Sequence, residues 1–297
     1  MRIRFDNVDL SSNSGPNSFA LKLANFLLSS GIQVSIDDRE VDIQLSFIQS
    51  NFCHDKIIQR LDGIYFNSAQ DWKRLNDPIK ITFQKSAAVI YQSNFNKELS
   101  EKYFGIHNQS RVIQNGTNLQ LIGNISPMQH ELFDTFDNVW SCASSWRPHK
   151  RLKENIRYFL EHGSRNDCLV VAGSNPDHVI NHERIFYVGN LDWQTLIGLY
   201  KASNNFIHLA LLDHCPNVVV DARAAGCHIV CTDSGGTKEI AGLDATIIKD
   251  LDWDFKPLKL YEPPDLDFTM KYSNKKSSII DIKETGQKYV KLFEGLI

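Results

Sequence analysis

Short runs of apolar residues alternate along the chain with longer segments in which apolar residues recur every three or four positions. The short runs predict strands, and the longer segments predict helices. In the first half, strands are expected at residues 2–8, 33–36, 41–48, 63–66, 87–91 and 111–114. Helices are expected from Gly15 to a stop at Gly31, from Asn94 to Phe104, and in a stretch after Asp71 that Pro78 should break.

The alternation restarts after an irregular stretch from Asn118 to about Phe136, which we interpret as a linker. Strands alternating with helices on both sides of it predict an α/β protein with two parallel-sheet domains. A single large doubly wound sheet is the alternative, and the irregular break favours two domains. In the second half, strands are expected at 139–143, 169–172, 185–188, 206–211, 229–231 and 246–248. Helices are expected at about 150–161, after an N-cap at Asp192, and at about 278–293.

The composition is ordinary for a globular protein, with 42% hydrophobic residues, 23% charged residues and a net charge of −3. Nucleic-acid binding usually needs a basic surface, so no nucleic-acid partner is expected. No apolar run reaches the roughly 18 residues of a membrane-spanning helix, so no transmembrane segment is expected. The first eight residues predict a strand and not a signal peptide, because Asp6 and Asn7 interrupt them.

The six cysteines form no Cys-x-x-Cys pair and indicate reduced thiols in a cytoplasmic protein. A zinc site built from Cys215, Cys227, Cys231 and a nearby histidine is an alternative, although its spacing matches no common ligand pattern. Two Asp-x-Asp sequences, at 252–254 and 265–267, lie in a weakly patterned stretch and are interpreted as solvated loop acids.

The chemistry concentrates around two acids that stand eight positions apart. Asp213 follows a predicted strand, and Asp221 lies in the first turns of the next helix. Both therefore belong to the carboxyl edge of a parallel sheet, where ligands bind. Asn217 and Val218 begin that helix, so their backbone N–H groups can face an anion. These features indicate a site for a sugar and a phosphate together.

Glycines and basic residues add to this picture. Gly235 and Gly236 form a turn after the next strand, and glycine lets the backbone approach a ligand closely. Arg147 and Lys150 precede a helix, where cations oppose the helix dipole, so an anion nearby would explain them. A solvated basic helix start and a plain strand-to-helix turn are the alternatives.

Together these residues resemble the GT-B glycosyltransferases, most closely the retaining enzymes of glycosyltransferase family 4, also called glycosyl transferases group 1. Asp213-x7-Asp221 resembles the Glu-x7-Glu motif of that family. Further resemblances are Gly235-Gly236-x-x-Glu239, the basic stretch 146–150, Gly15-Pro16 before a helix, Ser93-x-Phe95 and Asn115-Gly116. The resemblance implies two Rossmann-like domains that face a central cleft. Residues 1–125 would form the acceptor side and 137–277 the nucleotide-sugar domain, with the helix at 278–297 packing back on the first domain.

The resemblance also assigns roles. Lys150 and Arg147 would clamp the leaving diphosphate, Asp213 would contact the transferred sugar, and Asp221 would bind the ribose hydroxyls. Gly15 and Asn17 would close over the diphosphate from the first domain. The chain departs from the family in carrying Asp for both Glu residues, and Ser145 where the family has its usual arginine; Arg151 is a possible substitute.

In the first domain, His54 is the candidate for the catalytic histidine of the family. Arg60 and Asp62 are candidates for the acceptor or sugar side, with a salt-bridged loop as the alternative. His208 lies in an apolar strand and is interpreted as a core residue.

We therefore expect a cytoplasmic, retaining hexosyltransferase. It would move a hexose from a UDP- or GDP-linked donor to a glycan, lipid-linked or small hydroxyl acceptor, with no metal or other cofactor. A nucleotide-sugar epimerase and a catalytically weak nucleotide- or carbohydrate-binding protein are the alternatives. The sequence does not predict an oligomeric state.

Overall fold

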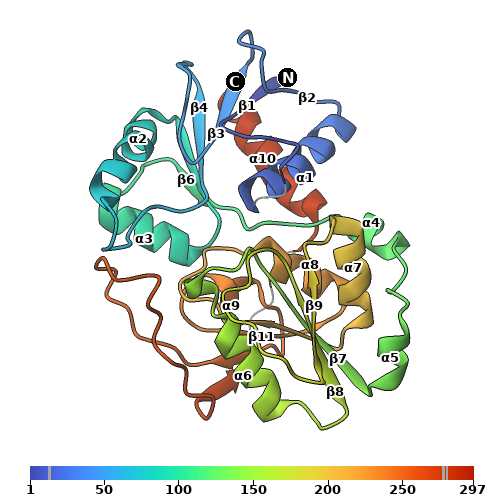
Figure 1. Ribbon diagram of the computed structural model, residues 1–297. Coiled ribbons are helices and arrows are strands. Elements are labelled where there is room, and N and C mark those ends of the chain that lie inside the picture. The colour runs from blue at the N-terminus through green and yellow to red at the C-terminus, as the bar shows by residue number, and fades with distance from the viewer. Residues whose placement is uncertain (13–14, 276–277, 279) are drawn as a thin grey trace. The chain divides into compact units, whose positions relative to one another are not determined.

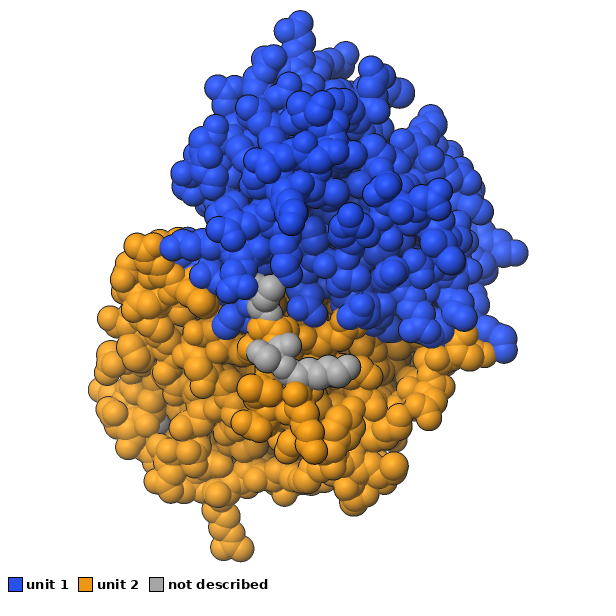
Figure 2. All heavy atoms as spheres, turned by 180° about the vertical axis from the view of Figure 1, so that it is seen from behind, with its two compact units in different colours: residues 1–118, 255–258, 279–297 blue, residues 119–254, 259–278 orange. Residues whose placement is uncertain are grey.

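The computed structural model describes residues 1–12, 15–275, 278 and 280–297. The chain divides into two compact units, drawn in Figure 1 and coloured separately in Figure 2. Unit 1 comprises residues 1–118, 255–258 and 279–297, and unit 2 comprises residues 119–254 and 259–278. In the part of the chain that is described, no helix has the length and apolar character needed to cross a membrane.

Unit 1 is a six-stranded parallel sheet in the order β2-β1-β3-β4-β5-β6. Its strands are β1 (Arg2–Asp6), β2 (Gln33–Ser35), β3 (Ile43–Phe47), β4 (Ile57–Leu61), β5 (Ala88–Tyr91) and β6 (Ser110–Val112). Its helices are α1 (Gly15–Ser29), α2 (Trp72–Lys85), α3 (Asn94–Phe104) and α10 (Ile282–Glu294).

The hydrophobic core of unit 1 joins both ends of the chain. Helices α1 and α10 lie side by side (Figure 1), and Phe19 of α1 packs against Tyr289 of α10 with ring centroids 6.1 Å apart. Both rings are buried together with Ile3, Phe5 and other strand residues. Unit 1 is therefore completed by residues from the far end of the sequence.

Unit 2 is a seven-stranded sheet in the order β13-β12-β11-β10-β7-β8-β9, parallel except for the edge strand β13. Its strands are β7 (Asn138–Ala143), β8 (Asp167–Ala172), β9 (Ile185–Gly189), β10 (Asn205–His208), β11 (His228–Thr232), β12 (Thr246–Ile248) and β13 (Lys271–Ser273). Its helices are α4 (Leu119–Asn124), α5 (Glu131–Thr135), the 3-10 turn η1 (Pro148–Lys150), α6 (Leu152–His162), α7 (Trp193–Ala202), α8 (Asn217–Ala225) and α9 (Thr237–Ile240).

The strand order of unit 2 creates a switch point. From β7 the chain builds β8 and β9 on one side, and β10 then pairs with the other side of β7. In open α/β sheets, ligands bind outside the carboxyl ends of the strands at such a reversal. A ligand-binding site is therefore expected at the loops that follow β7 and β10.

Three predicted elements differ from the structure. The strand expected at 63–66 is instead β4, at Ile57–Leu61. Helix α2 runs through Pro78, because the carbonyl that loses its donor belongs to Arg74, which is exposed and can bond to water. The stretch 118–136 contains α4 and α5 and is not irregular.

Candidate functional site

The two loops at the switch point of unit 2 meet in an ion pair. Lys150 ends η1 after β7, and Asp213 lies in the loop after β10. Lys150 Nζ donates to Asp213 Oδ2 at 2.5 Å, and His208 Nε2 lies 3.0 Å from the same oxygen. The Lys150 and Asp213 side chains remain 19% and 14% exposed. The structure thus brings together two of the residues predicted for catalysis.

The surroundings of Asp213 keep it ionised. Burial by itself would raise its pKa, but the positive charge of Lys150 and the hydrogen bonds from His208 and Lys150 outweigh burial. The pKa of Asp213 therefore lies well below its usual range. Burial lowers the pKa of His208 in spite of the neighbouring carboxylate, so this histidine is neutral at pH 7.

Two further histidines flank this ion pair in sequence. Burial, reinforced by the charge of Lys150, lowers the pKa of His149 to about 3. Burial also lowers the pKa of His214 to about 4, against the attraction of Asp213. Both histidines are therefore neutral at pH 7.

The glycine turn after β11 supports the backbone of Asp213. Gly235 has a φ of +85°, and a Cβ on it would lie 2.5 Å from the Asp213 carbonyl oxygen. The Gly236 N–H donates to that same oxygen at 2.7 Å. A larger residue at position 235 would push the two loops apart. The structure gives the turn a positioning role, and its predicted direct contact with a ligand stays a prediction.

Helix α8 begins at Asn217 and Val218, directly after Pro216, as expected for backbone N–H groups that face the carboxyl edge. Asp221 lies in the second turn of this helix, so the dipole at the helix start does not account for it. Its side chain is buried, with the residue 3% exposed. Trp193 Nε1 donates to Asp221 Oδ2 at 3.0 Å.

Trp193 is a site residue that the sequence reasoning missed. It is the first residue of α7, whose N-cap, Asp192, was predicted correctly. The signal was available, because a residue that follows the N-cap after β9 lies at the carboxyl edge of the sheet. What the sequence did not reveal is that α7 and α8 pack together there.

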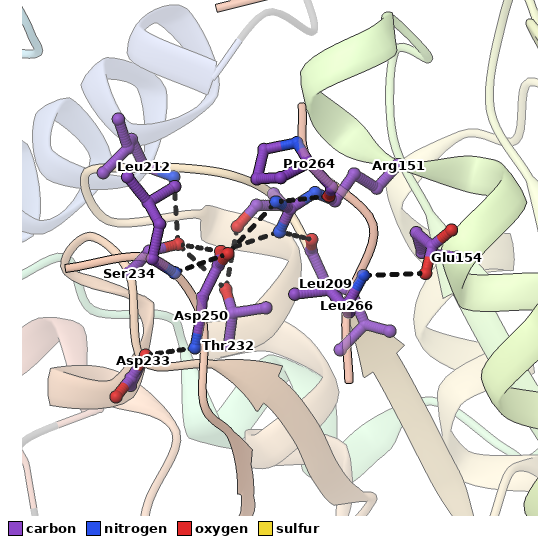
Figure 3. A network of polar contacts seen from close by, with 12 residues as sticks. Arg151, Glu154, Leu209, Leu212, Thr232, Asp233, Ser234, Asp250, Pro264 and Leu266 are labelled. Atoms are coloured by element: carbon purple, nitrogen blue, oxygen red, sulfur yellow. Dashed lines mark hydrogen bonds and ion pairs between the residues drawn. The ribbon is translucent and has the colours of Figure 1, made fainter. Parts of the chain in front are cut away.

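Arg147 of the predicted clamp and its possible substitute Arg151 lie in different environments. Arg147 is exposed and sits at the N-cap of η1, within the same loop as Lys150. Arg151 is buried in an ion pair with Asp250 (Figure 3), with both side chains 1% exposed. The suggestion that Arg151 substitutes for the arginine missing at Ser145 is therefore wrong, since its guanidinium is enclosed and engaged.

Unit 1 requires two corrections. His54 precedes β4, and its Nε2 lies 3.1 Å from the carbonyl oxygen of Val41, which precedes β3. His54 is therefore at the amino ends of these strands, opposite to the edge where ligands bind. Arg60 is fully buried within unit 1 and donates to Asn115 Oδ1 at 2.7 Å and to the Tyr289 hydroxyl at 3.1 Å. It acts as a core cation, not as an acceptor-binding residue.

The other candidates of unit 1 are placed as follows. Asp62 follows the carboxyl end of β4 and pairs with Arg60, which fits the salt-bridged alternative, and it accepts from Gln92 Nε2 at 2.8 Å. Gly15 is exposed at the start of α1. Asn17 Oδ1 accepts from the Asp9 N–H at 3.0 Å, so it helps to close the loop after β1. Residues 13 and 14 of that loop lie outside the described residues.

The sequence of unit 2 resembles that of a known protein family. Residues 169–254 match the sequence profile of the family described as Glycosyl transferases group 1. The matched segment lies within unit 2. It includes Asp213, Asn217, Asp221 and the glycine turn, whereas Lys150 and Arg147 lie before it. No curated protein matches the chain by sequence.

Solved structures extend the likeness to the whole chain. Sucrose-phosphate synthase from Thermosynechococcus elongatus has a TM-score of 0.70 at 13% identity, over 100% of this chain and 99% of that one. Anabaena HepE in complex with UDP-glucose has a TM-score of 0.69 at 13% identity, over 99% and 100%. WaaG, a glycosyltransferase involved in lipopolysaccharide biosynthesis, has a TM-score of 0.63 at 10% identity, over 100% and 93%.

These likenesses confirm the predicted α/β fold of the GT-B type. The match of residues 169–254 to Glycosyl transferases group 1 confirms the prediction that the chain is a glycosyltransferase. Among the described residues, no group of three histidine, cysteine or acidic side chains is placed to hold a metal ion.

Proposed function

We propose that the protein is a retaining hexosyltransferase of glycosyltransferase family 4. It takes a UDP- or GDP-linked hexose and transfers the sugar to a hydroxyl group of a glycan, lipid-linked or small acceptor. The observation that carries this proposal is the Lys150–Asp213 ion pair at the switch point of unit 2, the unit that contains the match to Glycosyl transferases group 1.

The ion pair fits the charges of this reaction. When the anomeric C–O bond breaks, negative charge grows on the departing diphosphate, and a fixed cation stabilises it. Lys150 Nζ is a partly exposed cation at the carboxyl edge, held in place by Asp213 before any donor arrives. The N–H groups at the start of α8 add a second source of positive potential.

The two acids of the motif divide the donor between them. Asp213 stays ionised and partly exposed, so its carboxylate can accept hydrogen bonds from hydroxyl groups of the transferred hexose. Asp221 is held by Trp193 and is assigned to the ribose. The donor would therefore span the carboxyl edge from β10 to α8.

The nucleotide and the absence of a cofactor belong to the proposal as well. Anabaena HepE, which shares the fold, was solved with UDP-glucose, so UDP-glucose is the first donor to test. Lys150, Arg147 and the start of α8 would supply the charge that a divalent metal supplies in other glycosyltransferases.

Donor binding provides the first test. The thermal midpoint should be measured with UDP, GDP, ADP and their sugar conjugates, with and without EDTA. A ligand that binds only the folded state raises the midpoint by mass action. We expect a shift with one nucleotide class that EDTA leaves unchanged. A shift abolished by EDTA would contradict the metal-free assignment, and no shift with any nucleotide would contradict the donor site.

Substitution of the central cation tests the assignment of the residues. Lys150→Ala should lower kcat about 10²- to 10³-fold, the usual loss when a stabiliser of developing charge is removed. Lys153→Ala is the matched control, because Lys153 lies one turn away and pairs with the exposed Asp265. Asp221→Ala should mainly weaken nucleotide binding. Full activity of both Lys150→Ala and Asp221→Ala would refute the site.

Product analysis separates the alternatives. Binding without turnover would favour the catalytically weak binding protein. Conversion of the nucleotide sugar in the absence of any acceptor would favour the epimerase.

A further inference from the structure

A buried ion pair between Arg151 and Asp250, drawn in Figure 3, begins at the residue that follows Lys150 in the sequence. Arg151 Nη1 donates to Asp250 Oδ2 at 2.7 Å, and Arg151 Nη2 donates to Asp250 Oδ1 at 3.1 Å. The guanidinium also reaches the carbonyl oxygens of Leu209 at 3.4 Å and Pro264 at 3.1 Å. This bidentate contact between the guanidinium and the carboxylate fixes the orientation of both side chains.

Arg151 has an unusual backbone conformation in addition to a buried side chain. Its φ of +53° places it in the left-handed region, which residues other than glycine rarely adopt. This conformation lets α6 begin immediately after η1, and it directs two consecutive side chains to different partners. Lys150 extends to Asp213, and Arg151 extends to Asp250. The pair with Asp250 holds Arg151 in this strained turn.

The contacts of Asp250 continue to the loop that carries Asp213. Ser234 Oγ donates to Asp250 Oδ2 at 2.6 Å and accepts from the Leu212 N–H at 3.4 Å. Leu212 precedes Asp213 and is itself left-handed, with a φ of +55°. Ser234 precedes Gly235, which packs on the backbone of Asp213. Asp250 is thus linked to both loops that position Asp213.

We propose that Arg151 and Asp250 form a positioning pair for the donor site. The pair holds Lys150 from one side and the backbone around Leu212 and Ser234 from the other, so that Lys150 Nζ and Asp213 Oδ2 stay together. Neither Arg151 nor Asp250 touches the donor. This inference rests on the proposed function, because the site that the pair positions is the proposed site for the diphosphate and the hexose.

A second ion pair in the same unit provides the matched control. Arg157 Nη2 donates to Glu154 Oε2 at 2.5 Å, and Glu154 is 5% exposed. Arg157 Nη2 also donates to the carbonyl oxygen of Leu266, two residues beyond Pro264. The two pairs therefore hold the same segment, but no contact shown for Glu154 or Arg157 leads to Asp213. Glu154→Gln should destabilise unit 2 without altering the site.

The experiment compares Asp250→Asn with Glu154→Gln at a temperature where both are folded. We expect Asp250→Asn to raise the Kd for UDP-glucose at least tenfold, and Glu154→Gln to change it less than twofold. The ring ¹⁵N resonances of His208, which contacts Asp213 Oδ2, should shift in Asp250→Asn and stay in place in Glu154→Gln. Equal effects of the two variants on both readouts would overturn the positioning role.

A double variant keeps the inference testable if Asp250→Asn fails to fold. Arg151→Met combined with Asp250→Leu removes both charges, and apolar replacement of a buried pair is often tolerated. We expect its thermal midpoint to approach that of the unmodified protein, while donor binding stays at least tenfold weaker. If the double variant recovered donor binding as well as stability, the pair would have a purely structural role and no role in positioning the site. If the unmodified protein binds no nucleotide sugar, the proposed function fails, and the His208 resonances alone decide the positioning role.

Discussion

At the scale of single residues, the two acids of the motif occupy different environments although they belong to one sequence pattern. Asp213 is partly exposed and meets Lys150, whereas Asp221 is buried against Trp193. The spacing of the acids fixed which strand and helix they belong to. It did not fix their partners, because Lys150 lies 63 positions from Asp213 and Trp193 lies 28 positions from Asp221.

The hydrogen bond of Trp193 leads to a prediction. Trp193→Phe keeps an aromatic ring but removes the N–H that orients Asp221, so nucleotide binding should weaken about tenfold or more. A hydrogen bond to a charged group contributes about 1.5–3 kcal/mol. Isothermal titration with UDP and UDP-glucose measures the effect.

The control for this prediction is a second Trp–Asp pair in the same unit. Trp140 Nε1 donates to Asp167 Oδ2 at 3.1 Å, and Asp167 begins β8, at the amino edge of the sheet. Trp140→Phe removes the same type of bond far from the carboxyl edge, so it should lower stability and leave nucleotide affinity unchanged. Equal losses of affinity in the two variants would mean that Trp193 has no special role.

Residue type also misled the sequence reasoning in unit 1. Arg60 was expected on the acceptor or sugar side, just before the strand expected at 63–66, whereas it lies within β4 and is buried. Its hydroxyl partner, Tyr289, lies 229 positions away. His54 was chosen for its neighbourhood in the sequence, yet only the strand register shows that it lies at the amino ends of β3 and β4.

At the scale of elements, apolar strands were predicted well and polar ones were not. Strand β12 matches the expected range, and β3 lies within its expected range. Strand β4 was displaced because Gln59 and Arg60 interrupt its apolar run, although both are buried. Gln59 is accommodated by bonds to the carbonyl oxygens of Ile48 and Ile79, which belong to other segments. The hydrophobic pattern of a sequence does not show which buried polar side chains will find hydrogen-bond partners in distant segments.

The turn between β11 and α9 provides a prediction at this scale. Gly235→Ala should lower the free energy of unfolding by more than the roughly 1–3 kcal/mol of backbone strain alone. The added methyl group also meets the Asp213 carbonyl oxygen, so turnover should fall as well. Urea unfolding and a transfer assay measure the two effects.

Gly226 is the matched glycine, because its φ is +105° and a Cβ there would meet no atom within 4 Å. Gly226→Ala should show the strain alone and keep its turnover. If both alanine variants retained full turnover, the Gly235 turn would have no part in positioning Asp213.

At the scale of the whole molecule, the buried histidines make stability depend on pH. The pKa of His149 is about 3 and that of His214 about 4 in the folded protein, both below the value of about 6.5 for an unfolded chain. Below pH 6.5 the unfolded state therefore binds more protons, and stability falls as the pH falls towards 4. Each histidine contributes a slope of at most about 1.4 kcal/mol per pH unit.

This dependence can be measured by urea unfolding between pH 4.5 and 7.5. In His149→Gln, the free energy of unfolding should change less steeply with pH below 6.5 than in the unmodified protein. The reason is that the residue at position 149 no longer takes up a proton on unfolding. An unchanged slope would show that His149 titrates equally in the folded and unfolded states.

The whole fold was more accessible to sequence reasoning than the site was. Strand–helix alternation is a local property that is repeated along the chain. The fold class was therefore predicted correctly in spite of the errors at β4 and in the stretch 118–136. The site depends on a few contacts between distant loops. Lys150 and Asp213 were named from the resemblance, but neither their ion pair nor the Arg151–Asp250 pair was foreseen.

The packing of α10 on α1 sets an order of events during synthesis. All residues assigned to unit 2 leave the ribosome before α10, because that unit ends at Ser278. Unit 1 begins first but cannot close its core until Tyr289 and Phe293 arrive. The usual N-terminal-first order of domain folding is therefore reversed. The face of α1 that packs on α10, which includes Phe19, stays uncovered until the last residues of unit 1 have been made.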